Sequence, residues 1–256
     1  MTQYSLVRHI HALTPLNEIW LILVFIENKI TKKNYPLDLL VNCFGLKYKL
    51  IDIESLSVIS PNFEPNYWAY MKPNKGDVFI DIGAHVGKYT MQAAKIVGDN
   101  GKVIAVEADP ITFKALSDGI IANGFRNVVA LNIAIYDKEC EVALHSVPID
   151  GKTEMGKGFT SVKRYVGPSV FVKAKPLDFI VNTLNLARVN FIKIDVEGAE
   201  LEVLKGARKT IEKFKPILVI EISMSKSEIF EIMNESRYSS RSIGPSYFCF
   251  TPINRF

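Results

Sequence analysis

Cysteine is scarce in this sequence, and its three cysteines lie far apart, at Cys43, Cys140 and Cys249. No two of them form a C-x-x-C pair, and an odd number of thiols cannot be fully paired as disulfides. The pattern argues against a disulfide-stapled secreted scaffold and against a cysteine-rich zinc site. It favours a reducing compartment, and we expect a cytoplasmic protein.

The chain also lacks a long hydrophobic run and a strong excess of one charge. Its most apolar stretch, residues 19–26, is too short to span a bilayer, and no signal peptide is expected. The net charge of +4 over 256 residues argues against DNA as a partner and does not favour RNA. Apolar spacing within residues 16–30 predicts a helix that packs on the core, on a second copy or on a membrane surface, so the oligomeric state stays open.

What the sequence does contain is a regular alternation of apolar strand-like segments and helical patterns. This alternation predicts an α/β fold with a mostly parallel sheet and helices on both faces. We expect a catalytic domain over residues 63–256 and a helical or extended appendage over residues 1–62. The expected strands are 78–82, 102–108, 127–135, 141–147, 191–196, 217–222 and 247–250, and the expected helices are 88–97, 110–124, 176–186, 198–214 and 226–237.

The first of these strands runs into a D-x-G-x-x-x-G motif formed by Asp81, Gly83 and Gly87. Ligands of open parallel sheets bind beyond the carboxyl ends of the strands. Gly83 permits a tight turn there, and Gly87 begins a helix whose free N–H groups attract anions. An ordinary glycine turn is the alternative. The dinucleotide fingerprint G-x-G-x-x-G is absent, which argues against a nicotinamide dehydrogenase.

The next two strands end in residues that suit a nucleoside. Glu107 lies at the end of the second strand, about twenty residues beyond Gly83, where an acid can accept hydrogen bonds from both ribose hydroxyls. A surface position at a strand end is the alternative for Glu107. The third strand runs into Ile133 and Ala134, where backbone groups can read the edge of an adenine.

Four charged residues crowd the end of the apolar strand at residues 191–196. Lys193, Asp195 and Glu197 share one face of that strand by alternation, and Glu200 opens the next helix. A buried ion pair of Lys193 and an electrostatic helix cap at Glu200 are the structural alternatives. We favour a functional role for Asp195, because it follows a central strand where a cofactor and an acceptor would meet.

Together, these motifs resemble the FkbM family of S-adenosylmethionine-dependent methyltransferases. The resemblance implies a Rossmann-like class I methyltransferase fold and S-adenosyl-L-methionine as cofactor. It implies that Asp81, Gly83 and Gly87 surround the methionine part of the cofactor and that Glu107 holds its ribose. His85 stands where the family usually has asparagine, and either side chain can hydrogen-bond the cofactor's polar end. The matching segments, in order, are 75–87, 106–110, 192–200 and 219–222.

By this resemblance the protein is expected to O-methylate a small polar acceptor, such as a sugar, a glycolipid or a secondary metabolite. Asp195, Glu197 and His85 are the candidate catalytic residues, Asp195 for its position and His85 for its ordinary pKa. We expect no metal site. Magnesium held by Asp195, Glu197 and Glu221 is the minority hypothesis. An RNA methyltransferase and a non-catalytic cofactor-binding interaction module are the alternatives.

Two further features bear on the acceptor. Tyr67, Trp68 and Tyr70 can stack on it, although aromatic residues in this position more often fill the core. Basic residues gather between residues 152 and 175, either as a solvated loop or as a rim that attracts an anionic acceptor. These basic residues are Lys152, Lys157, Lys163, Arg164, Lys173 and Lys175.

Overall fold

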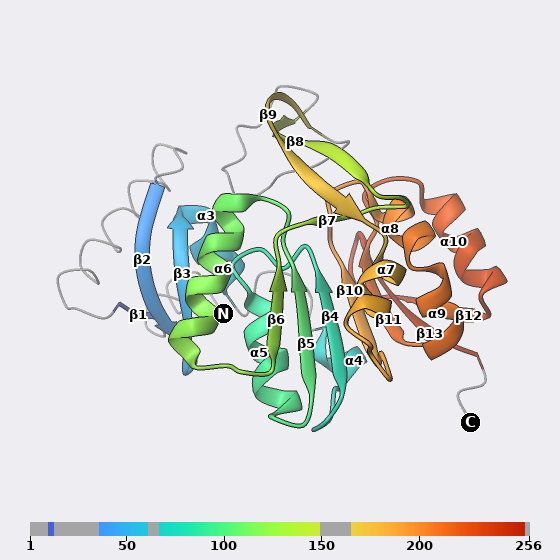
Figure 1. The fold of residues 1–256 in the computed structure, drawn as a ribbon, viewed down its shortest axis with the longest axis horizontal. Helices are drawn as coiled ribbons and strands as arrows, with labels where there is room; N and C mark the ends of the chain where they lie inside the picture. Colours follow the sequence, from blue (N-terminus) through green and yellow to red (C-terminus); the bar gives the residue numbers. More distant parts are fainter. Residues whose placement is uncertain (1–9, 13–35, 61–66, 149–164, 254–256) are drawn as a thin grey trace.

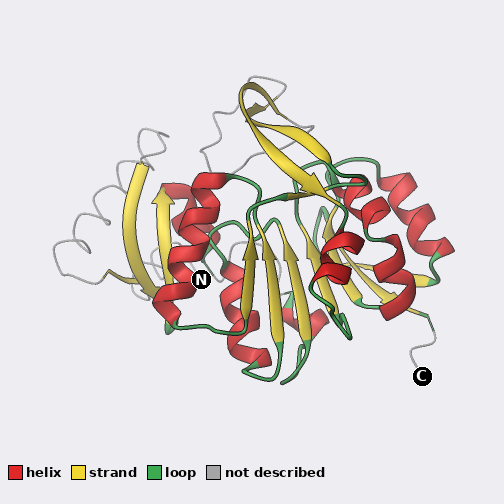
Figure 2. Ribbon diagram, viewed as in Figure 1, coloured by secondary structure: helices red, strands yellow, loops and turns green. Residues whose placement is uncertain are grey.

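The structure of the protein, a computed structural model, describes residues 10–12, 36–60, 67–148 and 165–253. Its central feature is a seven-stranded sheet in the order β12-β13-β11-β10-β4-β5-β6 (Figures 1 and 2). The strands, in chain order, are β4 (Val78–Ile82), β5 (Lys102–Val106), β6 (Val128–Leu131), β10 (Phe191–Ile194), β11 (Ile217–Glu221), β12 (Tyr238–Ser242) and β13 (Tyr247–Pro252).

The order of the strands reverses at β4, from which the sheet extends on both sides. β4 pairs in parallel with β5 on one side and with β10 on the other. β5 continues to β6 and β10 continues to β11, again in parallel, whereas β13 runs antiparallel to β11. The carboxyl ends of β4, β5 and β10 therefore meet at a topological switch point, which is where open α/β sheets bind their ligands.

Alternation along the strands decides which helices cover each face of this sheet. Ile80 and Ile192 pack with apolar residues of the C-terminal helices, whereas Phe79 and Phe191 pack on the opposite face with residues of α4 and α5. Asp81 belongs to the second series, so it faces α5. The helices are α3 (Ile53–Val58), α4 (Trp68–Met71), α5 (Lys88–Val97), α6 (Pro110–Asn123), α7 (Leu177–Thr183), α8 (Glu200–Gly206), α9 (Arg208–Phe214) and α10 (Lys226–Glu235).

Local signals set the ends of the two helices that follow β4 and β5. α6 begins as expected, because the Asp109 carboxylate accepts the N–H groups of Ile111 and Thr112, and Pro110 occupies the first helical position. It ends at Gly124, in the left-handed conformation. The order of strands and helices agrees with the alternation that the sequence predicts.

Three differences from the sequence expectation lie in the central sheet and the helices that cover it. The single strand expected over residues 127–135 is two strands, β6 in the central sheet and β7 (Ala134–Ile135) in another. The helix expected over residues 198–214 is broken at Ala207, between α8 and α9. β12 was not expected: it is an edge strand whose residues after Tyr238 are polar and exposed, so its sequence carries no apolar alternation.

A small three-stranded sheet of order β7-β9-β8 stands above the carboxyl ends of the central strands (Figure 1). β8 (Cys140–Pro148) and β9 (Tyr165–Lys175) form an antiparallel ribbon. Its inner face, with Val142, Leu144 and Val172, packs around Ala134 of β7. The ribbon thereby brings Leu144 toward the switch point.

The N-terminal part contains a β-hairpin, where the sequence predicts only a helical or extended appendage. β2 (Pro36–Cys43) and β3 (Leu46–Asp52) are joined at Phe44 and Gly45, both with positive φ, as a tight two-residue hairpin turn requires. β1 (Ile10–Ala12) pairs with β2 on the other side.

This hairpin shares a hydrophobic core with the segments that build the switch point. Leu50 and Leu56 pack in one cluster with Val86, Met91 and Leu116. The division into residues 1–62 and 63–256 stays a prediction. Described residues on the two sides of this boundary pack together in one hydrophobic core.

Two expectations fall partly or wholly outside the described residues. The first is the helix expected within residues 16–30. The second is the basic group between residues 152 and 175, of which four of the six residues lie outside the described ranges. Of that basic group, Lys173 and Lys175 lie on β9, and Lys175 pairs with Glu139 at 3.2 Å. None of the helices in the described part of the chain is long and apolar enough to cross a membrane.

Candidate active site

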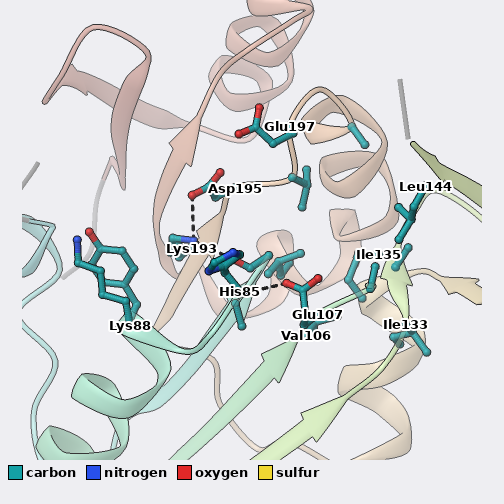
Figure 3. Close-up of a pocket in the computed structure, with 18 of the residues that line it drawn as sticks. His85, Lys88, Val106, Glu107, Ile133, Ile135, Leu144, Lys193, Asp195 and Glu197 are labelled. Atoms are coloured by element: carbon teal, nitrogen blue, oxygen red, sulfur yellow. Dashed lines mark hydrogen bonds and ion pairs between the residues drawn. The ribbon is translucent and has the colours of Figure 1, made fainter. Parts of the chain in front are cut away.

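A pocket opens at the switch point, between the ends of β4, β5 and β10 and the inner face of the β8–β9 ribbon (Figure 3). Strand-end loops supply its polar wall, and apolar residues of β7 and β8 supply the opposite wall. Its lining residues are Val58, Ile82, Gly83, Ala84, His85, Lys88, Tyr89, Val106, Glu107, Ala108, Ile133, Ala134, Ile135, Leu144, Lys193, Asp195, Val196, Glu197 and Ala199.

The turn after β4 is possible only because residue 83 is glycine. Gly83 has a φ of +76°, and a Cβ atom there would lie 1.7 Å from the backbone oxygen of Asp195. Its N–H donates to the carbonyl of Val106 at 3.0 Å. The loops after β4, β5 and β10 therefore touch through their backbones, and they hold the acidic residues that follow β5 and β10 close together.

Glu107 lies in this junction with its carboxylate at the wall of the pocket. The N–H of His85 donates to its Oε2 at 2.8 Å, and the N–H of Asp109 donates to its Oε1 at 2.9 Å. His85 has a φ of +52°, a conformation in which asparagine and histidine are enriched. Glu107 is only 8% exposed, and this burial raises its pKa to about 7.

Lys193 crosses from β10 to the underside of the same loops. Its ammonium lies 3.5 Å from Asp81 Oδ1 and 3.2 Å from Asp195 Oδ2, and it donates to the backbone oxygen of Gly83 at 3.2 Å. The pairing with Asp81 follows from strand register, because residues 193 and 81 are directly opposite in the β10–β4 pair. The buried ion pair considered from sequence is therefore present, and it links the loops after β4 and β10.

Asp195 is the acid of this group that reaches the pocket, with 16% of its side chain exposed. Burial acts to raise its pKa, but the Lys193 ammonium and a hydrogen bond with Glu221 outweigh it, so the pKa is lowered from its ordinary value. Burial and the charge of Asp195 raise the pKa of Glu221 to about 9. Near neutral pH, Asp195 is thus ionised and Glu221 carries a proton.

A third acid completes this cluster. Asp195, Glu197 and Glu221 each place one carboxylate oxygen within 4.8 Å of the others. The Ser246 hydroxyl also donates to Glu221, at 3.0 Å. The spacing permits the minority hypothesis of a bound cation. A proton on Glu221, hydrogen-bonded to the ionised Asp195, equally explains how two of these acids lie so close together.

The loop between β10 and α8 has an unusual backbone that positions Glu197. Glu197 and Gly198 both have positive φ, at +52° and +111°. The fully buried Glu200 carboxylate accepts the N–H of Gly198 at 2.7 Å, and burial raises the pKa of Glu200 to about 7. Glu200 therefore secures this loop from below the pocket rather than facing a ligand.

Seven of the residues predicted for the site line one pocket, whereas two do not. Asp81 is wholly buried beneath the pocket, where the Thr90 hydroxyl donates to it at 2.7 Å. Gly87 lies at the start of α5, where a Cβ atom would come within 2.7 Å of Leu116. Their roles in binding stay predictions. The seven that line the pocket are Gly83, His85, Glu107, Ile133, Ala134, Asp195 and Glu197.

The pocket also contains residues that sequence reasoning missed. Lys88 and Tyr89 are the first two residues of α5 and directly follow the glycine motif. Their position next to Gly87 is a sequence signal that could have marked them as pocket residues. Val58 and Leu144 come from α3 and β8, and no motif marks either of them.

The aromatic residues singled out from the sequence pack in one cluster with Tyr89 and do not line the pocket themselves. Tyr67 is almost fully buried and stacks on Tyr89, with 4.7 Å between the ring centroids. Trp68 also packs against Tyr89, at 5.7 Å between centroids. Of this aromatic group, Tyr89 is the member that lines the pocket.

A parallel sheet with one antiparallel strand next to its edge, and a pocket at the switch point, define a Rossmann-like fold of the class I methyltransferase type. The structure of methyltransferase FkbM from Methylobacillus flagellatus KT shares this fold. It superposes with a TM-score of 0.52 and 18% sequence identity, covering 77% of this chain and 54% of the other.

A family model described as the methyltransferase FkbM domain matches residues 81–241. That range is more than half of the chain, and the protein belongs to the FkbM methyltransferase family. Membership confirms the predicted family and fold class, and it confirms S-adenosyl-L-methionine as the cofactor.

Two relatives are similar in sequence over part of the chain. The hexuronic acid methyltransferase AglP of Haloferax volcanii is 25% identical over 64% of this chain and 64% of its own length. Methyltransferase 1 of Beauveria bassiana is 27% identical over 61% of this chain and 69% of its own length. The chain thus spans just under two thirds of the first of these proteins.

Proposed function

We propose that this protein transfers a methyl group from S-adenosylmethionine to a hydroxyl group of a small, sugar-like acceptor. The observation that carries this proposal is a single pocket that joins the buried acid Glu107 to the ionised acid Asp195. The named activity of the Haloferax relative supports an acceptor of the sugar class. A cytoplasmic location stays a prediction.

The residues present fit the cofactor. Each carboxylate oxygen of Glu107 accepts one backbone N–H and keeps a lone pair for a ribose hydroxyl. Ile133, Ile135 and Leu144 form an apolar wall beside it, which suits the flat face of an adenine. The turn at Gly83 leaves its backbone at the pocket for the methionine part. When bound, S-adenosylmethionine supplies a methyl group already activated by its sulfonium.

The chain's own task is then to align an acceptor and to handle its proton. Asp195 is ionised near neutral pH and can accept a hydrogen bond from an acceptor hydroxyl, orienting its lone pair and then taking the proton. Glu197 lies beside it as a second acidic contact. His85 is a poorer candidate for the base, because both of its ring nitrogens are buried, whereas 16% of the Asp195 side chain is exposed.

The first test is a calorimetric titration with S-adenosylmethionine and S-adenosylhomocysteine, with NAD as a control. We expect micromolar binding of both ligands and none of NAD, and Glu107→Ala is expected to weaken binding by about 100-fold, the cost of two hydrogen bonds to a charged group. If wild-type protein binds neither ligand, the proposed function is wrong.

The affinity for S-adenosylhomocysteine should also depend on pH. The pKa of Glu107 is about 7 in the free protein because of burial, with the neighbouring Asp109 charge acting in the same direction. Ribose hydroxyls favour the ionised form, so binding should strengthen as pH rises through 7. By linkage, we expect affinity at pH 6 to be about tenfold weaker than at pH 8. Titrations of Glu107→Gln should show no such change, and a persistent one would assign the effect to another group.

The two alternative functions remain distinguishable from this proposal. A non-catalytic binding module has no need for an ionised, partly exposed acid beside the cofactor, so the charge arrangement at Asp195 supports an enzyme. Methyl transfer to RNA would be revealed by RNA binding that weakens steeply with salt.

A further inference from the structure

Among the residues that the structure describes, three basic side chains line the pocket, and two of them are unsuited to binding an anionic ligand. Lys193 directs its ammonium to Asp81, Asp195 and the carbonyl of Gly83, which accounts for the three hydrogens of that group. His85 has its ring nitrogens shielded from solvent, and burial lowers its pKa, so its ring is neutral near pH 7. The third basic residue is Lys88.

Lys88 has an unusual environment for a lysine. It is the first residue of α5, it is only 5% exposed, and its ammonium lies 5.1 Å from the centroid of the Tyr89 ring. Placing an ammonium in a buried site is costly unless charges or hydrogen bonds compensate it. Lys88 has interactions within the protein, and three N–H donors allow it to hold a protein group and a ligand at the same time.

The position of Lys88 points to the acceptor rather than to the nucleoside. In Figure 3, Lys88 lies on the opposite side of the pocket from Glu107 and Leu144, with His85 and Asp195 between them. If Glu107 holds the ribose, Lys88 lies beyond the acid that we assign to the acceptor hydroxyl. A cation at that end would contact a group on the acceptor several bonds away from the methylated oxygen.

The charges around Lys88 select the kind of anion. Asp195 and Glu197 line the same pocket, and their negative charges disfavour a dianionic group such as a phosphate monoester. A lysine ammonium is a compact single positive charge, which balances one negative charge on a ligand. One ammonium beside two acids therefore suits a monoanion, and in sugar-like acceptors the common monoanion is a carboxylate.

We propose that the acceptor is an acidic sugar, and that Lys88 binds its carboxylate and so determines acceptor specificity. This inference rests on the proposed methyl transfer to a sugar-like hydroxyl and adds the charge of the acceptor to it. The Tyr89 ring forms the wall beside the ammonium and offers an apolar surface to the sugar.

The test compares methyl glycosides of glucuronic and galacturonic acids with the matching neutral glycosides, using labelled S-adenosylmethionine. Wild-type protein should prefer the acidic sugars. In Lys88→Met, which keeps chain length without charge, kcat/KM for the acidic sugar should fall about 10- to 100-fold. The rate with the neutral sugar should change by less than about threefold. Lys88→Arg should recover part of the preference.

Lys95→Met is the matched control, because Lys95 lies on the same helix with an exposed side chain. It removes the same charge and should leave the preference unchanged. Thermal unfolding of every variant separates lost specificity from lost structure.

Three results would overturn the proposal. One is an equal loss with acidic and neutral sugars in Lys88→Met. Another is a loss of S-adenosylhomocysteine affinity without loss of 5′-methylthioadenosine affinity, which would assign Lys88 to the cofactor's own carboxylate. A third is methylation of neither sugar class while wild-type protein binds S-adenosylmethionine, which would reject the acceptor and leave the cofactor assignment intact. Failure to bind the cofactor would instead reject the proposed function.

Discussion

Replacing Asp195 with asparagine is expected to lower kcat by about 100-fold or more, the range found for a positioned general base. Asparagine keeps the size of the side chain, and its amide oxygen can still accept a hydrogen bond from Lys193. It cannot take a proton from an acceptor hydroxyl. Because Glu107 and the Gly83 turn are untouched, the affinity for S-adenosylhomocysteine should change by less than about threefold. Initial rates with the true acceptor, together with calorimetry, measure both quantities.

Asp118→Asn provides the control for this substitution. Asp118 is not among the residues that line the pocket, and it pairs with Lys114 at 2.7 Å on the surface of α6. Surface ion pairs of this kind contribute little, so activity should be retained. Unchanged turnover in Asp195→Asn would show that Asp195 is not the base.

The same assays, repeated in EDTA, address the hypothesis of a bound cation. Full wild-type activity in EDTA would show that the carboxylates of Asp195, Glu197 and Glu221 act without a metal. Loss of activity that magnesium restores would favour the cation instead.

Gly83→Ala is expected to destabilise the protein by about 3–5 kcal/mol, and to abolish cofactor binding at temperatures where the variant stays folded. The added Cβ would lie 1.7 Å from the backbone oxygen of Asp195 and 2.8 Å from its carbonyl carbon. These backbone atoms lie at the end of the central strand β10, so they cannot move aside as a flexible side chain can. The positive φ adds a further conformational cost for alanine. Urea unfolding followed by circular dichroism measures the change.

Gly124→Ala separates these two contributions. Gly124 has a φ of +70°, close to that of Gly83, but a Cβ atom there would meet nothing within 4 Å. Alanine at residue 124 should therefore cost only about 1–2 kcal/mol, the price of the left-handed conformation. Equal losses at both glycines would show that steric contact with Asp195 does not matter.

Much of the fold could be predicted from the sequence because its signals are local. The apolar run at residues 78–82 and the Asp109–Pro110 helix start each depend on a few consecutive residues, and both occur as expected. Gly83, Glu107 and Asp195 could be placed near one another for a similar reason. Each follows a parallel strand, and the carboxyl ends of neighbouring parallel strands meet at one edge of a sheet.

Other parts of the site depend on contacts between distant segments, and local pattern carries no information about them. Val58 reaches the pocket because the N-terminal hairpin packs on α6, and Leu144 reaches it because β9 holds β8 over the switch point. The break at Ala207 follows Gly206, whose missing side chain leaves room for the carbonyl of Tyr136. Each of these depends on residues that are far apart along the chain.

The sequence alone determined the α/β class, the glycine turn and the acids at the strand ends, because alternation and spacing along one strand encode them. Only the tertiary structure decided which charges are committed to the fold and which face a ligand. Lys193 is bound by three acceptors, two from β4 and the turn after it and one from the loop after β10. Glu200 is enclosed beneath the pocket, and Lys88 reaches its wall. Burial and charge pairing of this kind are sums over all neighbours in space, so they exist only once the chain has folded.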